Sequence, residues 1–151
     1  MHALILHDCP KATTTLCAEL SYLGFTVTCV DSVREAMATL RPGRTDFLVL
    51  KEVIGNRHTT GVALAAEYRN PDVTAVLISQ RPRYEAIELL EGVPAITAIF
   101  GPAVADDPSP LCAVARAVRG GVEPPLILPP RQNMPHTSVA SSLPSFERRR
   151  A

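Results

Sequence analysis

Four consecutive apolar residues, Phe47 to Leu50, stop abruptly at the charged pair Lys51 and Glu52. Helical patterns lie on both sides of this run, and a polar loop separates it from Gly61. A short apolar run in this setting is typical of an interior strand of a parallel sheet, because helices cover both faces of such a strand. Binding and chemistry in open α/β sheets gather beyond the carboxyl ends of the strands. Lys51 is therefore expected to lie at the functional edge.

Strand and helix patterns alternate along the first 121 residues. Short apolar or β-branched runs predict strands at residues 3–6, 26–30, 47–50, 73–78 and 95–100. Apolar residues at helical spacing predict helices that begin near residues 11, 33, 62, 82 and 110. Right-handed crossovers place successive helices on the two faces of one sheet. The predicted fold class is therefore α/β, with a doubly wound five-stranded parallel sheet.

The composition changes beyond Gly121. Six of the 14 prolines fall in residues 122–151, together with a Ser-rich stretch and the basic run Arg148 to Arg150. A segment of this composition buries too little apolar surface to offset the entropy lost on ordering. We expect one domain over residues 1–121 and a flexible tail over residues 122–151. Docking of Leu126 to Leu128 on the domain or on a partner is the alternative.

Charge and cysteine usage exclude several classes of protein. Fifteen basic and 15 acidic side chains cancel, so we expect no nucleic acid and no membrane as partner. No signal peptide is evident, and no stretch approaches the roughly 20 apolar residues of a membrane span. The four cysteines form no CxxC pair, which argues against a zinc knuckle or a dithiol motif. Free thiols and a cytoplasmic location are expected.

The order of these segments resembles the receiver domains of bacterial two-component response regulators. The resemblance covers residues 3–119 and rests on ALILHDCP, TDFLVLK, GVALAAEYR, PDVTAVLIS and AITAIFGP. It implies a flavodoxin-like three-layer sandwich with the strand order 2-1-3-4-5. It also implies a role in two-component or phosphorelay signal transduction, with phosphoryl transfer at the carboxyl ends of the strands.

Most positions that carry the chemistry of this family are altered here. Lys51 stands where the resemblance places the phosphoacceptor aspartate. His7 replaces the first residue of the acidic pair that would hold a magnesium ion, and Asp8 keeps the second. Gly101 replaces the lysine that follows the fifth strand, whereas Ser79 keeps the hydroxyl position. The sequence therefore predicts a degenerate phosphorylation site.

The altered residues remove the chemistry of phosphoryl transfer. A lysine cannot form an acyl phosphate, and its ammonium group would occupy the space of the metal ion. We therefore expect no aspartyl phosphorylation, no metal, no cofactor and no enzymatic activity. Because the first and third strands are neighbours in the implied order, an ion pair between Lys51 and Asp8 is predicted. Such a pair at a partly exposed rim is worth about 1 kcal/mol and would bias the loops toward one state.

Other candidate sites have weaker support. His7, Asp8 and His58 carry metal-ligating groups, but they lack chelating spacing. Cys9 is interpreted as a packing residue in preference to a redox thiol. Ser79 lacks a nearby histidine and a G-x-S-x-G turn, which argues against a nucleophile. Nucleotide-binding glycine motifs are also absent from the sequence.

The favoured function is that of a pseudo-receiver that acts by phosphorylation-independent protein-protein interaction. Its partner would be a signalling kinase, a regulator, an effector or a second copy in a homodimer. The resemblance places the partner surface on the fourth helix, fifth strand and fifth helix, with the candidates Arg83, Tyr84, Ile87, Leu111 and Arg116. The alternative is a flavodoxin-like small-ligand-binding protein or enzyme that uses the strand-end crevice. The missing phosphate loop, and only three tyrosines and four phenylalanines, argue against flavin.

Overall fold

Five parallel strands form a single central sheet. The structure, a computed structural model, describes residues 1–41, 44–129 and 131. The strand order is β2-β1-β3-β6-β7, and a short hairpin takes the labels β4 and β5. The predicted fold class and the implied order 2-1-3-4-5 are therefore confirmed. The strands are β1 (His2–Leu6), β2 (Thr26–Val30), β3 (Phe47–Lys51), β6 (Thr74–Ile78) and β7 (Ile96–Phe100).

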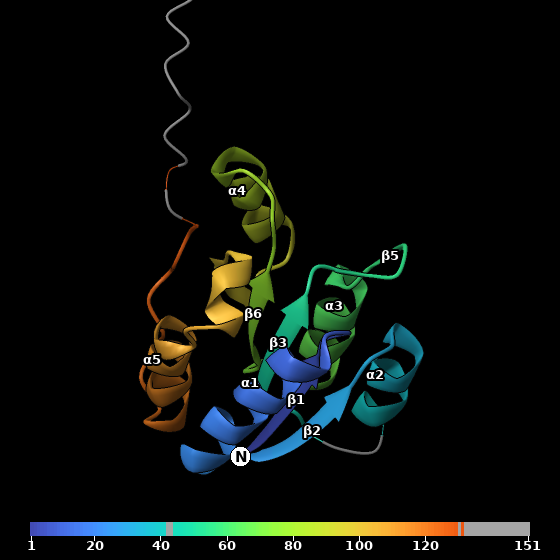
Figure 1. The fold of residues 1–151 in the computed structure, drawn as a ribbon, viewed down its shortest axis with the longest axis vertical. Helices are drawn as coiled ribbons and strands as arrows, with labels where there is room; N and C mark the ends of the chain where they lie inside the picture. Colours follow the sequence, from blue (N-terminus) through green and yellow to red (C-terminus); the bar gives the residue numbers. More distant parts are fainter. Residues whose placement is uncertain (42–43, 130, 132–151) are drawn as a thin grey trace, which may run out of the picture.

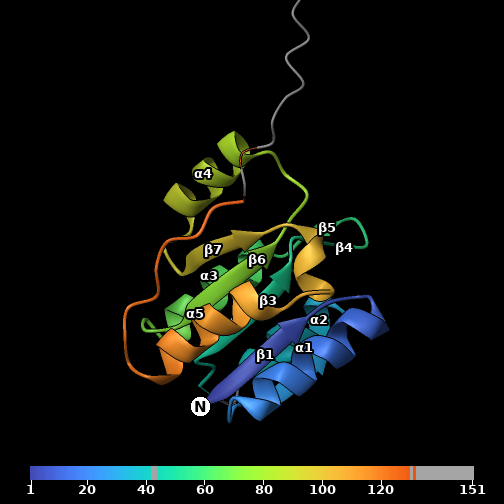
Figure 2. The same cartoon turned by 60° about the vertical axis from the view of Figure 1, so that its left-hand side comes forward.

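Helices cover both faces of the sheet and complete a three-layer sandwich, as Figures 1 and 2 show. One face carries α1 (Pro10–Tyr22) and α5 (Ser109–Arg119), and a 3-10 turn, Pro102–Ala105, precedes α5. The other face carries α2 (Val33–Leu40), α3 (Thr60–Arg69) and α4 (Arg83–Gly92). In the described part of the chain, no helix has both the length and the apolar character that a membrane crossing requires.

The hydrophobic core lies in two layers, because successive side chains of a strand point to opposite faces of the sheet. In β3, Leu48 and Leu50 belong to the layer under α2 and α3. Phe47 and Val49 belong to the layer under α1 and α5. All four side chains are fully buried, so β3 is an interior strand and its end at Lys51 is fixed in the middle of the sheet.

The segment after β3 is a hairpin, although the sequence predicts a polar loop there. β4 (Val53–Ile54) pairs antiparallel with β5 (Arg57–His58), and Gly55 makes the turn with φ 58°. The hairpin leads to the fully buried Thr59. The Thr59 hydroxyl donates to the carbonyl oxygens of Lys51 at 2.7 Å and Glu52 at 3.2 Å. These bonds tie the start of α3 to the end of β3.

Residues after α5 return along the outer edge of β7, as the orange segment in Figure 2 shows. The main-chain N–H of Ile127 donates to the Thr97 carbonyl at 3.1 Å, and the N–H of Ile99 donates to the Ile127 carbonyl at 2.9 Å. The sequence allows this part of the tail either to be flexible or to dock, and Ile127 docks on the domain. The predicted flexible tail from residue 132 onward, with its basic run, lies outside the described residues.

Candidate functional site

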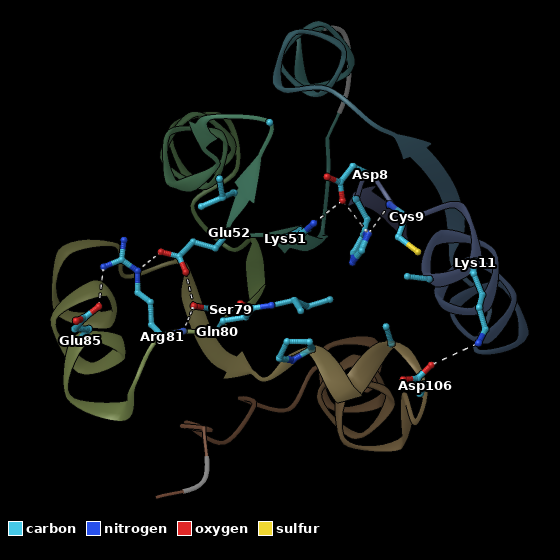
Figure 3. Close-up of a pocket in the computed structure, with 17 residues that line it drawn as sticks. Asp8, Cys9, Lys11, Lys51, Glu52, Ser79, Gln80, Arg81, Glu85 and Asp106 are labelled. Carbon is cyan, nitrogen blue, oxygen red and sulfur yellow. Dashed lines mark hydrogen bonds and ion pairs between the residues drawn. The ribbon is translucent and has the colours of Figure 1, made fainter. Parts of the chain in front are cut away.

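The carboxyl ends of β1, β3, β6 and β7 border a crevice of about 970 Å³, drawn in Figure 3. The structure brings the predicted site residues His7, Asp8, Lys51 and Ser79 together in its lining. Both signs of charge line the crevice, so it offers no general attraction to an anion. The charged lining residues are Asp8, Glu52, Glu85, Asp106, Lys11, Lys51 and Arg81.

Lys51 and Asp8 form the predicted ion pair. Lys51 Nζ donates to Asp8 Oδ1 at 2.7 Å, from the end of β3 to the loop after β1. The hydrogen bond from Lys51 is the main cause that lowers the pKa of Asp8 below its ordinary 3.8, and burial opposes it. The two side chains are 38% and 39% exposed, so solvent screens their attraction. The pair therefore positions the loop more than it stabilises the fold.

His7 lies next to this pair, with Nδ1 3.7 Å from Asp8 Oδ1, and is neutral. Its side chain is 7% exposed, and Nδ1 accepts a 3.0 Å hydrogen bond from the N–H of Cys9. An accepting Nδ1 carries no proton. Burial lowers the pKa of His7 below its ordinary 6.5, the Lys51 cation lowers it further, and Asp8 opposes both. His7 therefore adds no positive charge to the crevice near neutral pH.

Glu52 forms a second, more buried network on the opposite side of the crevice. Its side chain is 7% exposed, and its carboxylate accepts hydrogen bonds from the Ser79 hydroxyl and from Arg81 Nε. The Ser79 hydroxyl in turn accepts from the N–H of Arg81 at 2.9 Å. Arg81 Nη1 reaches Glu85 Oε2 at 3.3 Å. The hydrogen bond with Glu52 is the main cause that raises the pKa of Arg81 above its ordinary value.

Comparisons with solved structures identify the fold. A receiver domain from Methanospirillum hungatei matches with a TM-score of 0.65 and 12% identity, over 80% of this chain and 97% of that one. A response regulator receiver protein from Sinorhizobium medicae matches with a TM-score of 0.61 and 23% sequence identity, over 76% of this chain and 96% of that one. A response regulator from Burkholderia pseudomallei matches with a TM-score of 0.63 and 16% sequence identity, over 80% of this chain and 69% of that one. That protein was solved with a phosphorylated aspartic acid and a calcium ion. The chain has the receiver-domain fold.

Sequence comparison does not extend this result, because no family model and no curated protein matches the chain. The crevice therefore occupies the strand-end edge of a receiver fold, and the residues in it must be judged by their own geometry. Lys51 lies at the end of β3, between the end of β1 and the end of β6. An ammonium group bound to a carboxylate fills this central position.

Gly101, which follows β7, leaves one side of the receiver edge without a side chain. Its φ of −72° is accessible to any residue, and no atom lies within 4 Å of the position that a Cβ would take. A Cβ atom therefore has room at this position. The missing positive charge reflects the identity of the residue and is not imposed by crowding.

His7 and Asp8 lie next to each other in the crevice, but His58 does not complete a metal-ligating group with them in the described part of the chain. His58 lies exposed on β5, and the ranges that the structure describes hold no group of three histidine, cysteine or acidic side chains able to bind a metal ion. Cys9 lines the crevice, and its main chain supports His7. The acidic groups of the crevice are divided among three sets of ion pairs: Asp8 pairs with Lys51, Glu52 and Glu85 pair with Arg81, and Asp106 pairs with Lys11.

The prediction that Leu111 belongs to the partner surface is wrong. Leu111 is fully buried because α5 turns it inward with Val114 and Ala115, at the i, i+3 and i+4 positions of the apolar face. Tyr84 and Ile87 on α4 are 60% and 40% exposed. These two side chains remain candidates for contact with a partner. Arg83 is partly exposed and Arg116 is exposed.

Sequence reasoning missed Glu52 and Arg81. It treats Glu52 only as part of the charged pair that ends β3, and it does not consider Arg81. A signal was available, since both residues closely follow strands that lie side by side in the implied order, as Ser79 does. Polar residues just beyond adjacent strand ends meet at one edge, so the same reasoning that predicts the Lys51 pair applies to them.

Proposed function

We propose that this protein is a signalling module that binds a protein partner without taking up a phosphoryl group. The observation that carries the proposal is the position of the Lys51 ammonium at the end of β3, bound to Asp8 at 2.7 Å. The resemblance assigns this position to the phosphoacceptor. An amine in place of a carboxylate provides no oxygen for an acyl phosphate, and its charge repels a divalent cation.

The state of the other acidic groups supports this proposal. Asp8 is engaged by Lys51, and the Glu52 carboxylate accepts from Ser79 and Arg81. The lone pairs of these carboxylates are directed at internal cations and a hydroxyl. The Burkholderia protein carries a phosphorylated aspartic acid together with calcium. The internal ion pairs of the present chain support the proposal that its strand-end edge takes up neither a phosphoryl group nor a metal ion.

Internal ion pairs also suggest a fixed conformation of the loops. Lys51 joins the loop after β1 to the end of β3, and Arg81 joins the loop after β6 to Glu52. Because both links lie within the chain, no ligand is needed to set them. The module would present one surface to its partner at all times, and its affinity would not depend on a phosphate donor.

The exposed face of α4 is the partner surface that we favour. Tyr84 and Ile87 lie there, and Arg83 begins the helix. Aromatic and arginine side chains are the residues that most often carry binding energy in interfaces. Arg116 on α5 is a further candidate. We propose that a signalling kinase, a regulator or an effector binds here, with no enzymatic step in this chain.

A small-ligand protein remains the second candidate, because the crevice volume of about 970 Å³ lies at the upper end of the range for ligand pockets. No Phe, Tyr or Trp side chain is present among the described residues that line it. A flavin ring would therefore find no aromatic ring to stack on. Native mass spectrometry and an absorption spectrum of the purified protein test this candidate, since a retained ligand would favour it.

Substitution of two exposed tyrosines, one on the proposed partner surface and one away from it, tests the proposed surface. Tyr84→Ala should weaken binding of a recovered partner by about tenfold or more. Tyr22→Ala is the matched control, because Tyr22 is 87% exposed at the end of α1 on the opposite layer. Affinity should be the same with and without acetyl phosphate. Equal effects of the two substitutions, or an affinity that rises with acetyl phosphate, would contradict the proposal.

A further inference from the structure

The outer edge of β7 is covered by a short segment of the chain itself, residues 122–129. Figure 2 shows this segment leaving α5 and passing beside β7. Its contact with the strand centres on Ile127, which forms a parallel bridge with Ala98. The two main-chain hydrogen bonds of this bridge measure 2.9 and 3.1 Å. The Ile127 side chain is partly buried against the core layer that contains Phe100 and Val114.

The composition of the segment keeps this cover short. Pro124, Pro125 and Pro129 have no N–H group, so they cannot donate to a neighbouring strand. The segment also begins directly after Gly121, which has φ 68°. A single bridge between a glycine turn and flanking prolines is a local structure of low stability, which can open without unfolding the domain.

β7 itself holds a polar side-chain group that has no partner in the described part of the chain. The Thr97 hydroxyl is buried and has no hydrogen-bond partner among the residues that the structure describes. Thr97 lies at a register shift, since Ala75 pairs with Ile96 and Val76 pairs with Ala98. A buried hydroxyl without a partner destabilises the arrangement that buries it. A strand that brings a polar side chain to Thr97 would therefore match this edge better than residues 122–129 do.

We propose that the outer edge of β7 is a binding surface for an extended segment of a protein partner, and that residues 122–129 occupy it as an intramolecular competitor. The partner segment would offer a main-chain N–H and C=O to Thr97 and Ile99. It would carry a branched apolar side chain in the place of Ile127 and a hydrogen-bonding side chain near Thr97. This surface is distinct from the strand-end crevice and does not depend on the proposed absence of phosphorylation.

The competition follows from the tether. A segment held a few residues from its site has an effective concentration in the millimolar range, so a separate peptide of the same sequence cannot displace it at low concentration. A substitution that weakens the tethered segment should admit the peptide. Ile127→Asp places a charge against the core layer, whereas Leu126→Asp changes a neighbouring side chain that is 66% exposed. The two variants of the full chain therefore have the same charge change, but only Ile127→Asp is expected to open the edge.

The test uses NMR of the full chain and a synthetic peptide with the sequence of residues 122–131. In Ile127→Asp, the amide of Ile99 should exchange about tenfold faster or more than in the unsubstituted protein. The peptide, added up to about 5 mM, should shift the Ile99 resonance of this variant and not that of Leu126→Asp. Thr97→Val should have the opposite effect and slow exchange of the Ile99 amide by about fivefold, because it removes the unsatisfied hydroxyl.

Three results would overturn the proposal. One is unchanged exchange of the Ile99 amide in Ile127→Asp, because the segment would then not control this edge. Another is a failure of the peptide to bind Ile127→Asp at the highest concentration. The third is equal binding of the peptide to both aspartate variants. None of these results bears on phosphorylation, so they leave the proposed function to its own test.

Discussion

Lys51 Nζ lies 2.7 Å from Asp8 Oδ1 and joins the carboxyl ends of β3 and β1 by a direct hydrogen bond. The two residues are 43 positions apart in the chain, and the sheet order alone makes them neighbours. A receiver fold thus carries a fixed positive charge in the centre of its strand-end edge. The consequences of this charge can be measured on the residues around it.

Lys51→Ala should have a small effect on stability with a defined pH dependence. The pKa of Asp8 is lowered in the folded protein, so the contribution of the pair is present above pH 3.8 and is lost as the pH falls through the folded pKa. Because both side chains are more than a third exposed, the loss at neutral pH should be about 1 kcal/mol or less. Urea unfolding of both proteins at several pH values measures it. A difference that persists in strong acid would contradict the assigned cause.

Lys51→Ala should also raise the pKa of His7. The Lys51 cation is the second cause that lowers this pKa, after burial, so its removal makes protonation of the imidazole less costly. Stability linked to His7 is present above pH 6.5 and is lost as the pH falls from 6.5 through the folded pKa. In the variant the folded pKa lies closer to 6.5, so the pH range over which stability is lost is narrower. NMR titration of the ring protons measures both values. The pKa of His2 should stay unchanged, because burial and Asp46 are its leading influences.

The Glu52 network should respond unequally to the loss of Arg81 and to the loss of the Glu85 charge. Arg81→Ala leaves a buried carboxylate without its cation and should cost about 2–3 kcal/mol, reduced from the value for a fully buried pair because Arg81 is 33% exposed. Glu85→Gln removes only the 3.3 Å contact on the surface of α4 and should cost about 0.5 kcal/mol or less. Chemical denaturation measures both. Equal losses would show that the buried bond to Glu52 contributes little.

Thr59→Val should loosen the end of β3 while leaving the size of the side chain almost unchanged. The Thr59 hydroxyl is the donor that holds the carbonyls of Lys51 and Glu52, and the residue is fully buried. We expect a loss of about 1–2 kcal/mol and faster amide exchange in the β4–β5 hairpin. Thr14→Val is the control, because its hydroxyl bonds only to Pro10 within α1 at an exposed position. A hairpin as protected as before would contradict this role of Thr59.

The fold and one ion pair could be predicted from the sequence because they depend on patterns that extend over whole elements. The unbroken apolar run Phe47 to Leu50 is typical of an interior strand, and the sequence alone shows it. The structure buries all four side chains, as this pattern predicts. Adjacent interior strands then bring the residues that follow them together. Lys51 and Asp8 meet for this reason, and the implied strand order was sufficient to pair them.

The rest depended on local geometry that no periodic pattern carries. Glu52 turns inward because the unpredicted hairpin and the bonds from Thr59 set the direction of the chain after β3. The resemblance assigns Leu111 to the partner surface, although its helical spacing with Val114 already marks it as part of the apolar face. Ile127 contacts β7 although the two are about 30 residues apart in the chain. A single bridge has no periodic pattern in the sequence, so it could not be predicted.

Restoration of the missing groups offers a positive counterpart to the proposed function. The triple variant His7→Asp, Lys51→Asp and Gly101→Lys supplies an acidic pair, a carboxylate at the end of β3 and a lysine after β7. A Cβ atom at position 101 meets no atom within 4 Å, and the receiver fold already sets the positions of all three residues. We expect this variant to gain one phosphoryl group from acetyl phosphate and magnesium, provided that circular dichroism shows the native fold.

Intact mass of the unsubstituted protein after incubation with acetyl phosphate and magnesium tests the central claim most directly. The account predicts no phosphoryl adduct, because the central position of the strand-end edge holds the Lys51 ammonium and the nearby carboxylates are engaged. Addition of one phosphoryl group that is lost in base, as an acyl phosphate is, would contradict it.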